Sequence, residues 1–186
     1  MRSTALLVST FLIVSCADLT NYQTSGNLQA LGPDGCVNVS ALNNRNTPVD
    51  IFLGVRKCMA NKDYPRAVRL YAVAGLYGRI DQLRVKDESA HQAISVLRLA
   101  HVSSFPKEDV DAFQQNLKST AQQGSSELAA LCTEIKRLGP PAYFPTYMVK
   151  HGMGAFLGGD SSGPLKSNFN MNEAWKGSLD SFLHCP

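Results

Sequence analysis

Apolar residues recur at helical spacing through most of this chain, and that periodicity restricts the fold more than any other feature. After Thr47-Pro48, the residues Phe52, Val55 and Met59 lie three or four positions apart, on one face of a helix. A threonine followed by a proline is a typical helix start, because the threonine caps free amides and proline fits the first helical position. No alternating apolar and polar run continues long enough to indicate a strand. The pattern therefore predicts an all-α fold.

The same spacing divides residues 47–186 into a bundle of about six helices. Residues 64–78 are apolar on nearly every side, so we expect this segment in the middle of the bundle. Further helices are expected to begin near Asp87, Pro106 and Ser125, and the third of these ends at Gly139. A short helix is predicted over residues 145–153, and a last one over residues 172–183 with an inward face formed by Trp175, Leu179 and Phe182.

Ten mostly apolar residues near the start, 5–14, follow the basic Arg2 and give way to small residues, as in a secretory signal peptide. A helix of that length rises only about 15 Å, too little to cross a hydrocarbon core of about 30 Å. The ending Ile13-Val14-Ser15-Cys16 resembles a bacterial lipobox, which implies that Cys16 is acylated and becomes the first residue of the mature chain. The alternative is cleavage after Ala17, which would discard Cys16.

Residues 16–46 are rich in Asn, Ser, Thr and Gly and show little periodicity. The predicted organisation is therefore a signal peptide over residues 1–15, an irregular lipid-anchored tether and lead-in segment over 16–46, and one helical domain over 47–186. Loss of residues 1–15 removes only Arg2, which leaves 17 basic and 15 acidic residues. A charge so nearly balanced gives no indication of a nucleic acid as partner.

Four cysteines remain when Cys16 is set aside, and an even number in an exported chain favours disulfides. None of the four forms a C-x-x-C pair, so neither a zinc ribbon nor a redox motif is indicated. Of the possible connectivities, we favour Cys36 with Cys58 and Cys132 with Cys185, because these pairs close the shorter loops. Each such loop would contribute about 3 to 4 kcal/mol of stability. The expected domain is a single helical bundle braced by disulfides.

Residues 159–163, Gly-Asp-Ser-Ser-Gly, place Ser161 in the G-x-S-x-G pattern of serine hydrolases. That pattern works on a strand-turn-helix element, whereas here Pro164 follows and no strand pattern precedes. A Gly/Ser/Asp run of this kind is ordinarily a loop, and we favour that interpretation. The alternative function is a periplasmic serine hydrolase that uses Ser161 with His151 or His184.

The histidines give no metal motif, because no two of them stand three or four positions apart. His101 falls on an apolar stripe, where a hydrogen-bonded core histidine is expected. His151 is followed by Gly152 and Gly154, which would let a ligand or backbone come close. Of the four histidines, we therefore favour His151 as the candidate functional residue. Its alternative is a helix-end histidine favoured by the helix dipole. We expect no cofactor.

Aromatic residues cluster in the proline-bounded segment after Gly139. Binding energy in protein complexes rests on a few exposed anchors, many of them aromatic. Tyr143, Phe144 and Tyr147, with His151, are therefore the candidate partner-binding residues. The alternative is that the three aromatic side chains pack this segment onto the bundle.

The stretch DYPRAVRLYAVAGLYG, residues 63–78, resembles the second helix of a tetratricopeptide or Sel1-like hairpin. The resemblance covers about 30 residues and has no second copy at the expected period, roughly 34 residues. One unit makes no solenoid, so we expect an ordinary central helix rich in Ala and Tyr.

Two other stretches, LGPPAYFPTYMVKHGMGAF and AWKGSLDSFLHCP, resemble small exported helical proteins of Gram-negative bacteria, some of them encoded beside type VI secretion effectors. The resemblance extends over about the last two thirds of the chain. It implies a non-catalytic immunity lipoprotein, anchored to the envelope and facing the periplasm, that binds and neutralises a secreted toxin. A structural envelope lipoprotein is a further alternative.

Overall fold

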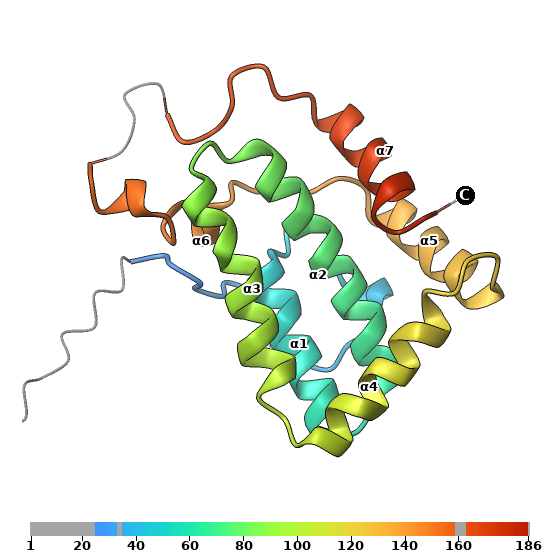
Figure 1. Ribbon diagram of the computed structural model, residues 1–186. Coiled ribbons are helices and arrows are strands. Elements are labelled where there is room, and N and C mark those ends of the chain that lie inside the picture. The colour runs from blue at the N-terminus through green and yellow to red at the C-terminus, as the bar shows by residue number, and fades with distance from the viewer. Residues whose placement is uncertain (1–24, 33–34, 159–162, 186) are drawn as a thin grey trace, which may run out of the picture.

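The computed structural model describes residues 25–32, 35–158 and 163–185. Within these ranges the chain is all-helical, with an isolated bridge between Val85 and Leu165 but no strand. Seven α-helices are present rather than about six: α1 (Pro48–Ala60), α2 (Tyr64–Arg84), α3 (Gln92–Arg98), α4 (Lys107–Thr120), α5 (Ser126–Leu138), α6 (Thr146–Val149) and α7 (Met171–Ser181). Figure 1 shows α2 in the centre, with α1 and α3 to its left and α4, α5 and α7 to its right.

The start of α1 is the capping motif that the sequence predicts, and it also holds the lead-in segment. The backbone amide of Asp50 donates to the Thr47 hydroxyl, and the Thr47 amide donates to the Asp50 carboxylate at 2.7 Å. The other carboxylate oxygen accepts from the amides of Leu31 and Gly32, at 2.6 and 2.7 Å. One aspartate therefore satisfies free amides of the helix and fixes part of the predicted tether against the bundle.

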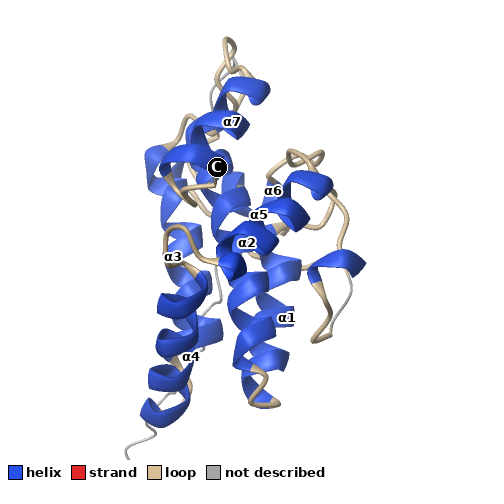
Figure 2. Cartoon of the chain, turned by 90° about the vertical axis from the view of Figure 1, so that its right-hand side faces the viewer, coloured by secondary structure: helices blue, strands red, loops and turns tan. Residues whose placement is uncertain are grey.

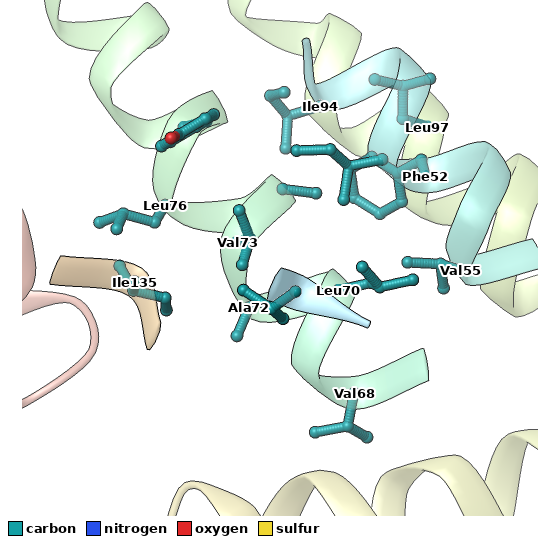
Figure 3. Packing of buried hydrophobic residues seen from close by; sticks show 14 of the residues in the cluster. Phe52, Val55, Val68, Leu70, Ala72, Val73, Leu76, Ile94, Leu97 and Ile135 are labelled. Carbon is teal, nitrogen blue, oxygen red and sulfur yellow. The ribbon is translucent and has the colours of Figure 1, made fainter. Parts of the chain in front are cut away.

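The central helix α2 continues to Arg84, beyond the predicted end at Gly78. Gly78 does not end the helix, because its missing side chain makes room for α3: a Cβ there would lie 2.8 Å from Cγ1 of Ile94. The buried residues of α2 form the centre of the core with side chains from α1, α3 and α5, including Phe52 and Ile135 (Figure 3). The expectation of a central, nearly all-apolar helix is confirmed.

Two disulfides brace the bundle, with the pairing that the shorter loops favour. Cys36 is bonded to Cys58 near the end of α1, and Cys132 of α5 is bonded to Cys185 after α7. The first bond ties the lead-in segment to the bundle and the second ties the chain's last described residue to it. Loops that span 22 and 53 positions are each expected to contribute about 3 to 4 kcal/mol.

The short helix predicted over residues 145–153 is only four residues long, and a separate 3-10 turn follows at Met153–Ala155. The helix ends because Asp87 and Ser89 capture the next backbone segment. The amide of Gly154 donates to the Asp87 carboxylate and that of Met153 to the Ser89 hydroxyl, both at 2.8 Å. Gly152, just before this turn, packs against Ala90: a Cβ added at position 152 would lie 2.8 Å from Cβ of Ala90.

The last helix, α7, packs along the right-hand face of the bundle, which Figure 2 shows from the front. Leu179 is buried and Trp175 packs against the core, as expected. Phe182 departs from the expectation: it follows the end of the helix and is 38% exposed. Among the described residues, no helix combines the length and the apolar character that crossing a lipid bilayer requires.

Candidate functional site

A fully buried carboxylate, Asp81 on α2, is the centre of a polar cluster. Its Oδ2 accepts hydrogen bonds from the hydroxyls of Tyr143 and Tyr147, at 2.9 and 2.7 Å. Its Oδ1 accepts one from Nε of Arg84 at 2.8 Å. Nη2 of Arg84 lies 2.6 Å from the same oxygen and adds an ion pair, although it makes no hydrogen bond within the described part of the chain.

The electrostatics of this cluster indicate a structural role. Burial raises the pKa of Asp81, and the Arg84 charge and the tyrosine hydrogen bonds oppose that shift. Burial and the nearby carboxylate together raise the pKa values of Tyr143 and Tyr147 well above 10. Both tyrosines are therefore hydrogen-bond donors at neutral pH, and the Arg84 guanidinium packs over the Tyr143 ring at 5.2 Å. The cluster fastens the segment after α5 to the central helix.

The three aromatic residues that are candidates for partner binding differ in how far they are exposed. Tyr147 is 1% exposed, so it has no surface to offer a partner, and packing onto the bundle is its role. Tyr143 is half-buried and fulfils the same packing role through Asp81. Phe144 is 53% exposed and retains the surface that an anchor residue needs.

His151 is half-buried beside the start of the described chain. Its Nδ1 lies 3.0 Å from the amide oxygen of Asn27, and burial lowers its pKa. An amide oxygen orients the ring but does not stabilise the charged imidazolium as a carboxylate would. The contact therefore assigns His151 to fixing the lead-in segment against α6.

The structure does not test the hydrolase alternative, because Ser161 lies outside the described residues. Cys16 lies outside them too. His184 is exposed, with a positive φ of 55°, just after α7. Within the described ranges, no three His, Cys, Asp or Glu side chains stand close enough to hold a metal ion.

His101 differs from the hydrogen-bonded core histidine that the sequence predicts. It is half-buried, and its ring stacks on Phe52 with centroids 6.2 Å apart. Its buried Nδ1 has no hydrogen-bond partner among the residues that the structure describes. Burial and the nearby Arg56 lower its pKa. The residue fills space as an aromatic side chain and carries an unsatisfied polar atom.

An apolar cleft of about 240 Å³ opens on the right-hand face of the molecule, and we name it the α2–α7 cleft. Small side chains of α2, Ala72 and Gly75, leave room at its base. Its walls come from α4, from α5 and from the residues after α7. The lining residues are Val68, Tyr71, Ala72, Gly75, Leu117, Thr120, Ala121, Leu128, Leu131, Phe182, Leu183 and His184.

The sequence gives only a faint signal for this cleft. Ala72 and Gly75 stand on the helix that periodicity assigns to the core, where small residues indicate close helix packing. Whether such positions are covered depends on the helices that pack against them. In the structure Gly75 is buried at the base of the cleft, and the ring of Phe182 lies 3.4 Å from where its Cβ would be.

A second, wider groove of about 610 Å³ lies between the end of α2 and the segment after α6. Apolar side chains dominate its lining, among them Val85, Val149 and Leu157, and the charged residues Lys86, Asp87 and Lys150 border it. No protein-family model, no curated protein and no solved structure matches this chain. The cleft, the groove and the N-terminal sequence are therefore the features that bear on function.

Proposed function

We propose that this chain is a non-catalytic, lipid-anchored periplasmic protein that binds and neutralises a secreted bacterial toxin, as immunity proteins do. The observation that carries the proposal is the apolar α2–α7 cleft. The helices α4, α5 and α7, which border it, lie on the side of the bundle away from the blue start of the described chain (Figure 1). A protein anchored at its N-terminus would direct this cleft towards the periplasm, where a toxin arrives.

The lining of the cleft suits insertion of an apolar side chain from a partner. About 240 Å³ is enough for one or two large side chains, and a pocket that desolvates such an anchor concentrates the binding energy there. Phe182 and His184 at the rim add an aromatic ring and an exposed imidazole beside the apolar base. The expected partner therefore presents an exposed aliphatic or aromatic residue on a convex surface.

Two further observations support export. The sequence begins with a signal-peptide pattern that ends in Cys16, and both disulfides join cysteines that would be reduced in a bacterial cytoplasm. Disulfides between the lead-in segment and α1, and between α5 and the C-terminal residues, also suit a small domain in an oxidising compartment such as the periplasm.

A charge placed at the rim tests the cleft. Ala121 is exposed and lines the cleft, so Ala121→Arg should block an apolar anchor without disturbing the core. Ala130→Arg, an exposed position on α5 outside the lining, is the matched control. Calorimetry against any secreted toxin found to be encoded near the gene should show binding at least tenfold weaker for Ala121→Arg and unchanged for Ala130→Arg. Equal affinity of both variants would move the binding site elsewhere.

Catalysis is tested separately by survival of cells that receive the same toxin. Ser161→Ala should protect as well as the wild-type chain, because binding alone neutralises the toxin. Loss of protection by a folded and abundant Ser161→Ala variant would favour the hydrolase alternative instead.

A further inference from the structure

Several large apolar side chains are exposed in the short segment after α6. Three of them, Met153, Phe156 and Leu157, fall within five consecutive residues after α6, and we name them the apolar shoulder. Their exposed fractions are 58%, 51% and 79%. Eight large apolar side chains are exposed among the described residues: Leu31, Val96, Leu99, Phe144, Met153, Phe156, Leu157 and Phe182.

The described chain begins against the same corner. The amide of Leu28 donates to the backbone oxygen of Tyr147 at 3.4 Å, and Asn27 contacts His151 at 3.0 Å. His151 stands two positions before the shoulder. Figure 1 shows the blue start of the described chain and the orange segment after α6 on the same left-hand side.

Covalent geometry limits how far this corner can lie from an anchored Cys16. At about 3.3 to 3.6 Å per residue, the chain from Cys16 to Ser25 spans at most about 32 Å, whatever its conformation. An acyl chain on Cys16 would therefore keep Ser25 within about 32 Å of the bilayer, on the side of the domain that carries the shoulder. Three large apolar side chains held there gain more by entering the interfacial region than by facing water.

The charges around the shoulder are compatible with a lipid surface. Lys150, directly after α6, borders the adjoining groove, and Lys166 is exposed beside a neighbouring hollow. Lysines at this position can extend to lipid phosphates while their aliphatic stems cover apolar surface. The nearest carboxylate, Asp87, is occupied by hydrogen bonds from Ser89 and from the amide of Gly154, while Glu88 is exposed.

From these observations we infer that the apolar shoulder docks into the surface of the bilayer that carries the lipid anchor. The inference rests on the proposed anchoring at Cys16 and goes beyond it, because it fixes the orientation of the domain. With the shoulder in the interface, the α2–α7 cleft on the opposite side points away from the membrane.

Tryptophan quenching by brominated acyl chains tests this orientation. Leu157→Trp is made in a Trp175→Phe background, so that the new indole is the only one in the chain. The matched control is Leu99→Trp in the same background, because Leu99 is 65% exposed at the end of α3, away from the shoulder. Each processed lipoprotein is reconstituted into phosphatidylethanolamine and phosphatidylglycerol vesicles, and acylation of Cys16 is verified by mass.

Brominated lipids should quench Leu157→Trp at least about twofold more than Leu99→Trp, and Phe156→Trp should behave like Leu157→Trp. Equal quenching at positions 157, 156 and 99 in an acylated, vesicle-bound protein would overturn the docking while leaving the anchor intact. A chain that lacks an acyl group on Cys16 would overturn both the docking and the anchoring. The two failures are thus distinguishable.

Discussion

The hydroxyl of Tyr147 lies 2.7 Å from a carboxylate oxygen of Asp81, a residue 66 positions earlier in the chain. Both side chains are buried, so neither can exchange this bond for water. The contact joins α6 to the central helix and thereby positions everything that follows α6, including His151 and the apolar shoulder. This bond therefore helps to position the segment after α6, against which the start of the described chain lies.

Removal of that hydroxyl should be costly. Tyr147→Phe leaves Asp81 one donor short in a buried site, so the free energy of unfolding should fall by about 1 to 3 kcal/mol. Tyr143→Phe removes a longer bond to the same oxygen from a half-buried side chain, so its cost should be smaller. Urea denaturation of the two variants measures the difference. An equal loss in both variants would show that burial of the hydroxyl does not determine how much its hydrogen bond contributes to the free energy of unfolding.

Local patterns in the sequence could predict the helices and the disulfides, but they could not predict this cluster. The Thr47-Pro48 start and the stripe of Phe52 and Met59 depend on neighbours within one or two turns, and the structure confirms them. Asp81 is different, because its burial depends on Tyr143 and Tyr147, more than 60 positions away. A lone charged residue near a helix end gives no sign of such partners.

The same reason explains why the described part of the lead-in segment, residues 25–32 and 35–46, is docked on the bundle rather than merely a tether. Its residues lack the periodic apolar pattern that indicates a helix or a strand. In the structure, their backbone amides bond instead to Asp50 and to the carbonyl of Tyr147. Backbone contacts of this kind depend on the fold of the bundle and leave no side-chain pattern in the segment itself.

His101 should make the protein sensitive to acid. Burial lowers its folded-state pKa below the ordinary 6.5, so below that pH the unfolded chain takes up a proton that the folded chain resists. The contribution is complete above about pH 6.5 and is lost as the pH falls through the folded pKa.

His101→Phe should remove this part of the acid sensitivity. It also removes the unsatisfied Nδ1 and keeps a ring against Phe52, so the free energy of unfolding at pH 5 should rise by about 1 kcal/mol. Denaturant titrations at a series of pH values measure the slope. A variant that loses stability between pH 7 and pH 5 as steeply as the wild type would contradict the assignment to His101.

The two disulfides should differ in their contribution. In the chain-entropy description, opening the 53-position loop of Cys132 and Cys185 costs about 4 kcal/mol, and opening the 22-position loop of Cys36 and Cys58 costs about 3 kcal/mol. Paired alanine variants, Cys132→Ala/Cys185→Ala and Cys36→Ala/Cys58→Ala, are compared by guanidinium denaturation. A larger loss for the Cys36 pair would show that native-state contacts outweigh loop length.

Thiol titration provides an independent measurement of the same bonds. The mature protein, with Cys16 acylated, should show no reactive thiol in denaturant before reduction and four afterwards, those of Cys36, Cys58, Cys132 and Cys185. Two reactive thiols without reductant would mean that one bond does not form in the exported chain.

Three glycines in helices should respond differently to the same added methyl group. Replacing a helical glycine by alanine ordinarily stabilises a helix by about 1 kcal/mol, provided that the Cβ has space. At Gly177 in α7, no described atom beyond the adjoining backbone lies within 4 Å of a Cβ, so Gly177→Ala should give the full gain. At Gly78 a Cβ would lie 2.8 Å from Ile94, so Gly78→Ala should cost about 1 to 3 kcal/mol through overpacking.

Gly75 lies at the base of the α2–α7 cleft, and the stability effect of Gly75→Ala is expected to fall between those of Gly177→Ala and Gly78→Ala. A Cβ there would lie 3.4 Å from the ring of Phe182, which is partly exposed and has room to move. Gly75→Ala should therefore gain part of the helical stabilisation, less than about 1 kcal/mol, while it makes the cleft shallower. Thermal and urea denaturation rank the three variants. If Gly75→Ala proved as destabilising as Gly78→Ala, Phe182 would have to be fixed in place, and the cleft would be a rigid part of the core instead of an opening that a partner can enter.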